Sequence, residues 1–415
     1  MTDSGGSSAI RVATLATMAA GGPLRRGASL GEPEVVRDGV LALSDGVVTY
    51  AGPAVGFADA SPGASVVDLG DVAVVPGFVD MHSHVPFFGW RADEHAARLA
   101  GRSYRDLHGE GGIGRTARML AGASDDEVVA FCRPLLDEML TAGTTALELK
   151  TGYGLSVDAE LRLARLARRL AAEVPQTCTV TLLACHAVPP GVDRADWVRT
   201  ACGELIPAAA ADGLVDAVDI YVEDIAFSLD DLAAVAEAAA AAGLPLRCHA
   251  DQLGWSGAAE AAVRLGARSA DHLNHAGPAG IAALGGAPAT VAGLLPASTF
   301  TLRARPAPAR ELIEAGAAVA LATDCNPGTS PVLSMPEVVA MGCTLYGLAP
   351  LEALTAATIN PAWVLGLHQR VGSLERGKQA DFLVLDSPDL DMVPYRAGHN
   401  PVRETWIAGR RTNRN

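Results

Sequence analysis

The chain has 415 residues, which is long enough for one large domain and a smaller partner. It carries 32 Lys and Arg against 47 Asp and Glu, a formal charge of −15, and this acidic balance argues against nucleic-acid partners and anionic membrane surfaces. Apolar residues make up 49% of the chain, so a large core is expected. The sequence has no stretch of about 18 consecutive apolar residues, so we expect no membrane span.

Cysteine usage and the first residues bear on the compartment. The chain contains seven cysteines, an odd number, without a C-x-x-C pair. This pattern favours reduced thiols and a cytoplasmic protein over a disulfide framework. The opening MTDSGGSSAI lacks a basic segment followed by an apolar run, so we expect no signal peptide.

Short apolar strands separated by Gly, Pro and Asp are predicted near both ends of the chain. At the start they cover 10–15, 39–43 and 46–51, and near the end they cover 381–385 and 405–407. We therefore predict a small β-sandwich-like domain built from both termini, residues 1–72 and 371–415. The segment 73–370 is then inserted between its two halves.

The inserted segment alternates apolar runs with Ala-, Leu- and Arg-rich stretches of helical period, such as 158–173 and 232–242. The runs that resemble buried parallel strands are 74–80, 145–150, 180–186, 217–223, 244–249, 269–273, 290–295 and 317–324. Eight such units in series are the number that closes a barrel. The predicted fold class is α/β, a (β/α)8 TIM barrel.

Imidazole and carboxylate side chains stand where several of these runs end. His82 and His84 are spaced i, i+2, so both point to one face of an extended strand. The other polar strand ends are His249, Asp271, His272 and Asp324. All of them meet at the C-terminal mouth of a barrel, where active sites lie. His and Asp are ligands of Zn²⁺ and iron, so these residues predict a metal site. The alternative for an isolated H-x-H is a pair of core or solvated histidines, which matching ends on several strands disfavour.

The number of metal ions is predicted from the fourth strand of the barrel. Two-metal barrels of this kind need a bridging carboxylate there, often a carbamylated lysine. The strand reads VDIYVED and contains no lysine. We therefore expect one divalent ion, Zn²⁺ or Fe²⁺/Fe³⁺. Lys150 closes the second strand, and we expect a structural or substrate-facing role for it rather than a bridge.

Several motifs resemble a known family over most of the chain. The opening PGFVDMHSH resembles the amidohydrolase superfamily in general. Further motifs resemble one family within that superfamily, the imidazolonepropionases. They are GWRADE (89–94), ELKTGYGL (148–155), HAVPP (186–190), HADQL (249–253), SADHL (269–273), ALATDCNPGTSP (320–331) and PYRAGHNPV (394–402).

The resemblance implies a role for each matching residue. The metal shell would be His82, His84, His249 and Asp324. The substrate contacts would be Arg91, Tyr104, Tyr153, His186, Gln252, Asn326, Gly328 and Thr329. The catalytic residues would be His272, Asp324 and His186, with His272 a histidine that is not a permanent ligand.

The implied reaction opens the cyclic amide of 4-imidazolone-5-propanoate to N-formimidoyl-L-glutamate in histidine degradation. Arg91 would bind the carboxylate tail through charge-assisted hydrogen bonds, although a solvated loop residue is the simpler interpretation of an isolated arginine. A bound metal activates water, whose proton passes to Asp324 or His272, and His186 supports the oxyanion. Gln252 stands where some members have Glu, and because an amide cannot act as a base we expect it to hold a ring nitrogen.

Two other functional classes stay open at this point. One is a different mononuclear amidohydrolase, such as a deaminase of a nitrogen heterocycle, which would not need Arg91 as a carboxylate clamp. The other is a binding protein without catalysis, which the full ligand set disfavours. The partner is expected to be a small molecule, and barrels of this size often form homodimers.

Overall fold

The computed structural model describes residues 8–19, 21–57, 65–103, 106–107 and 111–412. Tyr104 lies outside these residues. Within the described residues, no helix is both long and apolar enough to cross a membrane.

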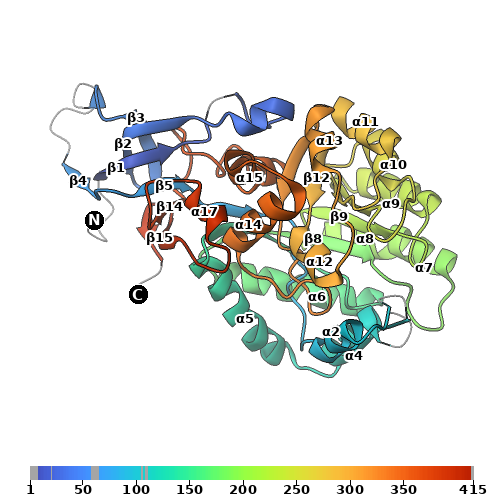
Figure 1. Ribbon diagram of the computed structural model, residues 1–415. Coiled ribbons are helices and arrows are strands. Elements are labelled where there is room, and N and C mark those ends of the chain that lie inside the picture. The colour runs from blue at the N-terminus through green and yellow to red at the C-terminus, as the bar shows by residue number, and fades with distance from the viewer. Residues whose placement is uncertain (1–7, 20, 58–64, 104–105, 108–110, 413–415) are drawn as a thin grey trace.

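The two ends of the chain build one sheet that lies beside the barrel, with its early strands in blue and its late strands in red (Figure 1). Its strands are β1 (Ser8–Ala16), β2 (Val35–Ser44), β3 (Val47–Pro53), β4 (Val66–Asp68), β5 (Ala73–Pro76), β14 (Phe382–Leu385), β15 (Val402–Ile407) and β16 (Arg410–Arg411). The order is β16-β15-β14-β5-β1-β2-β3, and β4 pairs with β1. Apolar side chains from both ends share one core, in which Phe382 stacks on Trp406 with ring centroids 5.2 Å apart. A separate sheet formed from both termini is thus confirmed.

The middle of the described chain forms a nearly closed barrel of eight parallel strands, as predicted. They are β6 (Phe78–Asp80), β7 (Thr144–Lys150), β8 (Thr177–Cys185), β9 (Ala217–Val222), β10 (Leu246–Ala250), β11 (Ser269–His272), β12 (Val291–Leu294) and β13 (Ala318–Leu321). Their residues are almost all buried, because helices cover the outside and side chains fill the inside.

The run 74–80 does not form one barrel strand, and that prediction was wrong. Val74 and Val75 pair with β14 in the terminal sheet, whereas Phe78–Asp80 pairs with β7 in the barrel. Gly77 separates the two parts, and a Cβ at this position would overlap the side chain of Thr145. The chain therefore passes from sheet to barrel through one close backbone contact. The domain boundaries at 72 and 371 stay a prediction.

Helices connect and cover the barrel strands (Figure 1). They are α2 (Ala92–Leu99), α4 (Gly112–Ala121), α5 (Asp125–Thr141), α6 (Val157–Glu173), α7 (Arg194–Thr200), the π-helix η2 (Ala201–Leu205), α8 (Ile206–Ala211), α9 (Leu229–Ala241), α10 (Ala258–Arg264), α11 (Pro278–Gly286), α12 (Pro296–Leu302), α13 (Ala309–Glu314), α14 (Met335–Tyr346), α15 (Pro350–Ala356), α16 (Ile359–Val364) and α17 (Met392–Tyr395), with the 3-10 turn η1 (Gly27–Gly31) before them. Serine side chains cap α5, α6 and α9 by accepting backbone N–H bonds, at Ser124, Ser156 and Ser228. The two helices expected at 158–173 and 232–242 are α6 and α9.

The first and last barrel strands meet just beyond their ends. The amide of Asp324 donates to His82 O at 2.9 Å, and the amide of His84 donates to Cys325 O at 2.8 Å. Asp324 itself has a φ of 53°, a left-handed conformation that turns its side chain after β13. Barrel closure therefore brings residues far apart in sequence to the same place.

Candidate active site

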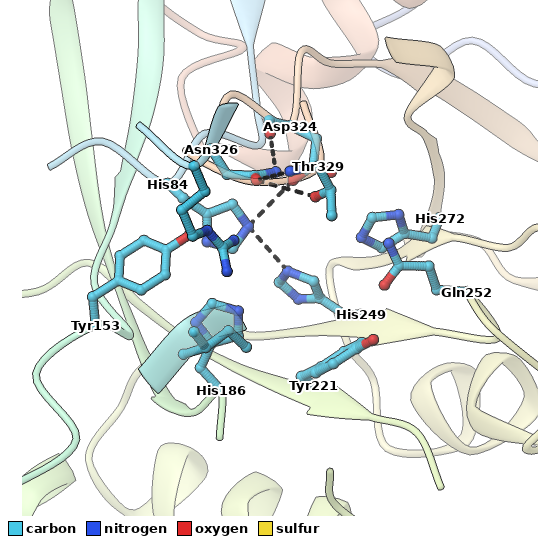
Figure 2. A pocket seen from close by; sticks show the side chains of 12 residues that line it. His84, Tyr153, His186, Tyr221, His249, Gln252, His272, Asp324, Asn326 and Thr329 are labelled. Carbon is cyan, nitrogen blue, oxygen red and sulfur yellow. Dashed lines mark hydrogen bonds and ion pairs between the residues drawn. The ribbon is translucent and has the colours of Figure 1, made fainter. Parts of the chain in front are cut away.

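His82, His84, His249 and Asp324 bring their side chains to one point at the mouth of the barrel. Figure 2 shows three of them, His84, His249 and Asp324. We call these residues the His/Asp cluster. The Nε2 atom of His84 lies 3.3 Å from Nε2 of His82 and 3.4 Å from Nε2 of His249. Oδ1 of Asp324 lies 3.3 Å from Nε2 of His84 and 3.6 Å from Nε2 of His82. These spacings suit ligands arranged around one ion.

Carboxylates behind the cluster determine which nitrogen of each ring faces it. Nδ1 of His82 lies 2.7 Å from Asp271 Oδ2, and Nδ1 of His249 lies 3.2 Å from Asp219 Oδ1. A carboxylate accepts the Nδ1 proton, so each neutral ring presents an Nε2 lone pair to the cluster. Burial also lowers the pKa of His82 and of His84, which keeps both rings neutral. The Nε2 lone pairs of His82 and His249 therefore both face the cluster, which fits a bound cation.

His272 lies beside the cluster rather than apart from it. Its ring can place a nitrogen within 4.8 Å of the ligand atoms of His82 and Asp324. The residue has a φ of 78°, and such backbone strain is often found at functional sites. Burial lowers the pKa of His272 to about 3. The ring is therefore neutral, and because so low a pKa makes it a weak base, its role as a proton acceptor stays a prediction.

A pocket of about 350 Å³ opens in front of the cluster. Its lining comprises His84, Arg91, Ile113, Tyr153, His186, Tyr221, His249, Gln252, His272, Asp324, Asn326 and Thr329. Six of the residues expected to touch substrate line it: Arg91, Tyr153, His186, Gln252, Asn326 and Thr329. Gly328 does not line the pocket but lies against the guanidinium of Arg91, and His82, although a member of the cluster, is fully buried and does not line the pocket either.

The guanidinium of Arg91 brings unused hydrogen-bond donors to this pocket. It is 3% exposed, and among the described residues Nε and Nη1 have no hydrogen-bond acceptor. The carboxylate of Glu94 approaches Nη1 only to 3.5 Å. A buried guanidinium with unused donors is costly unless a ligand completes its bonds. Arg91 can thus receive an anionic group inside the pocket.

Tyr153 and His186 lie side by side in the lining of the pocket, with ring centroids 5.2 Å apart (Figure 2). Glu160 holds the loop of Tyr153 by accepting the amides of Gly152, Gly154 and Leu155 at 2.6–3.1 Å. Nδ1 of His186 lies 3.0 Å from Gly152 O and must donate to it. The neutral His186 ring therefore presents Nε2 as an acceptor, and it donates to an oxyanion only when doubly protonated.

The turn after Asp324 is organised by Asn326. Its Oδ1 accepts the amides of Gly328 and Thr329 at 3.0 and 2.7 Å, and its Nδ2 donates to Asp324 O at 2.7 Å. The amide of Arg91 donates to Pro327 O at 2.9 Å. Asn326 lines the pocket, but its own amide group is used to shape the turn that carries Thr329.

Several functional positions were not assigned from sequence. Asp219 and Asp271 orient His249 and His82, and Tyr221 and Ile113 line the pocket. Asp219 and Tyr221 share the inward face of β9, and the alternation in VDIYVED could have revealed them. Lys150 is paired with Glu148 at 2.7 Å and Asp219 at 2.6 Å, so it does not face the cluster as a ligand.

Comparison with known proteins agrees with this site. The model of the Amidohydrolase family matches residues 73–412. An imidazolonepropionase from Deinococcus radiodurans is 43% identical over 386 residues, which cover 93% of this chain and 94% of that protein. An imidazolonepropionase from a Methylobacterium species is 44% identical over 403 residues, covering 96% and 98%.

Among solved structures, an adenosine deaminase from Xanthomonas campestris with bound zinc has a TM-score of 0.72 at 21% identity, covering 97% of this chain and 92% of that one. At this identity the likeness shows a shared fold. The family match and the sequence relatives also show the family of the chain. The chain belongs to the amidohydrolase family and, within it, to the imidazolonepropionases, and it is a hydrolase.

Proposed function

We propose that this pocket hydrolyses the cyclic amide C–N bond of 4-imidazolone-5-propanoate and releases N-formimidoyl-L-glutamate, a step of histidine degradation. The observation that carries the proposal is the buried guanidinium of Arg91, whose Nε and Nη1 have no hydrogen-bond acceptor among the described residues, in the same pocket as the His/Asp cluster. A substrate with a carboxylate tail and a ring carbonyl would use both features. A neutral heterocycle without a carboxylate would leave these hydrogen-bond donors of Arg91 unused.

His82, His84, His249 and Asp324 would hold one divalent ion, and three imidazoles with one carboxylate suit Zn²⁺ or iron. When bound, such an ion lowers the pKa of water and polarises a carbonyl group. The lone pairs that face one another across the cluster support this assignment.

The other side chains would bind and orient the substrate. Arg91 takes the propionate through charge-assisted hydrogen bonds. Tyr153, with Tyr104 as an expected neighbour, and Thr329 border the tail, while Gln252 meets a ring nitrogen. Gly328 contributes by leaving room for the Arg91 guanidinium.

His272 and Asp324 would move the protons. The neutral ring of His272 accepts a proton from the attacking water and returns it to the leaving nitrogen. Asp324 points into the same space and supports the transfer (Figure 2). His186 stands against the ring of His84, with centroids 5.2 Å apart, where its protonated form would stabilise the oxyanion.

The test is an assay of ring opening with metal analysis on the same protein sample. We expect N-formimidoyl-glutamate by mass spectrometry and a divalent ion in the protein. Release of ammonia from a neutral nitrogen heterocycle, without ring opening of imidazolone propionate, would replace this proposal with a deaminase.

Two further predictions concern the state of the protein. We propose a cytoplasmic location from the cysteine pattern, and a homodimer, which analytical ultracentrifugation tests directly.

A further inference from the structure

Beneath the His/Asp cluster, the charged side chains of Glu148, Lys150, Asp219 and Arg247 fill the barrel interior, and none is more than 1% exposed. They belong to β7, β9 and β10. We propose that Lys150 is a positioning residue that determines metal affinity by holding Asp219 against His249. The inference rests on the proposed metal site and names a residue that touches neither metal nor substrate.

The first step concerns Asp219, whose two oxygens have separate partners. Oδ2 lies 2.6 Å from Nζ of Lys150. Oδ1 lies 3.2 Å from Nδ1 of His249 and accepts the amide of Ile220 at 2.7 Å. The carboxylate cannot rotate without losing contacts on both sides. Lys150 therefore fixes the oxygen that orients the imidazole of His249.

The second step concerns what fixes Lys150. Its Nζ also lies 2.7 Å from Oε2 of Glu148. Oε1 of Glu148 accepts the hydroxyl of Thr181 at 2.5 Å and contacts the guanidinium of Arg247. Glu148 and Lys150 are spaced i, i+2, as are Arg247 and His249, so each pair faces the barrel interior. The lysine thus has a defined position between two carboxylates.

The third step is the charge balance. Two cations and two anions cancel within this buried group, and removing the ammonium of Lys150 leaves an anion without its partner. Such an anion is strongly unfavourable inside a protein, so Asp219 would move toward other donors. His249 would then lose the acceptor that holds its ring. Loss of such outer partners typically weakens metal binding about 10–100-fold.

The experiment is a double-mutant cycle read as Zn²⁺ affinity, measured on the full chain by competition with a chromogenic chelator. Lys150→Met and Asp219→Asn should each weaken Zn²⁺ binding about 10–100-fold. Because Lys150 acts through Asp219, the double variant should bind no worse than the weaker single variant. Wild-type affinity in Lys150→Met, or losses that multiply in the double variant, would overturn the inference.

Arg25→Met is the matched control for loss of a buried cation. Arg25 is 2% exposed and donates to Met18 O at 3.0 Å, away from the His/Asp cluster. The variant Arg25→Met should lower Tm and leave Zn²⁺ affinity unchanged. If Lys150→Met does not fold, Glu148→Gln replaces it in the same double-mutant cycle. Glu148→Gln alone should then weaken Zn²⁺ binding less than is expected for Lys150→Met. Wild-type protein that binds neither zinc nor iron would instead refute the proposed function.

Discussion

Gly328 packs directly against the guanidinium of Arg91, so closely that a Cβ at position 328 would overlap Nη2 and Cζ. The amide of Arg91 is bonded to Pro327 O at 2.9 Å, and Gly328 O accepts Nη2 of Arg98 at 2.8 Å. Hydrogen bonds from Arg91 and from Arg98 therefore fix the turn next to the Arg91 guanidinium. The absence of a side chain at 328 allows Arg91 to lie where it lines the pocket.

Gly328→Ala should displace the Arg91 guanidinium and lower kcat/KM by roughly 10²-fold, since misplacing a binding group by about 1 Å has that effect. This loss should come mainly from a higher KM, and the metal content should not change. Gly286→Ala is the control, because a Cβ there meets nothing within 4 Å. Equal kinetics for both variants would show that Arg91 tolerates the methyl group.

Arg91→Ala should weaken substrate binding by roughly 2–5 kcal/mol, the cost of truncating one partner of a buried charge pair. Arg91→Lys should recover part of the loss, since it restores the charge without the planar fork. Steady-state kinetics with imidazolone propionate measure both. Unaltered kinetics in the alanine variant would remove Arg91 from the binding site.

His272→Ala should keep the metal and lose about 10²–10⁴-fold in kcat, the usual contribution of a general acid–base group. The measurement pairs turnover with elemental analysis, because His272 can also reach ligand distance of His82 and Asp324. Loss of metal together with activity would make His272 a ligand. Near-wild-type turnover would leave Asp324 as the proton acceptor.

Protein purified without added metal should contain about one divalent ion per chain, and chelation should abolish turnover, which Zn²⁺ or Fe²⁺ restores. The physical reason is that Lys150 is held between Glu148 and Asp219 and does not supply a second bridging ligand. Elemental analysis after dialysis measures the ratio. Two tightly held ions per chain would contradict a mononuclear site.

Glu223 should make stability depend on pH. It is 4% exposed, its Oε1 accepts the amides of Gln252 and Leu253 at 2.6 and 2.7 Å, and burial raises its pKa to about 7. In the unfolded chain a glutamate ionises near about 4.3, so between that pH and 7 the native state binds the proton more tightly. This group therefore lowers the free energy of unfolding as pH rises through that window.

Glu223→Gln keeps the amide-accepting oxygen and does not titrate. Relative to wild type, the variant should gain about 1–3 kcal/mol in free energy of unfolding between pH 4.5 and 7.5. Urea unfolding at both pH values measures the change. A difference between the two proteins that stays constant with pH would show that Glu223 ionises normally.

The amino-acid sequence by itself determined the barrel, the sheet from both termini and the strand ends that carry the His/Asp cluster. These features are local: buried parallel strands appear as short apolar runs, and the spacing of His82 and His84 places both rings on one face. The position of Asp324 after the last run belongs to the same local pattern. The family motifs added the candidate roles of Arg91 and Gln252.

Tertiary structure alone decided what depends on contacts between distant strands. It divided 74–80 between two sheets, because pairing with β14 and with β7 competes for neighbouring residues. It placed Asp219 and Asp271 behind His249 and His82, since closure of the barrel determines which inward side chains meet. It lowered the pKa of His272 to about 3 through burial, which no single segment shows. The pattern of residues along the chain indicates which side chains face inward. Only tertiary packing determines which residues they contact and whether they are charged.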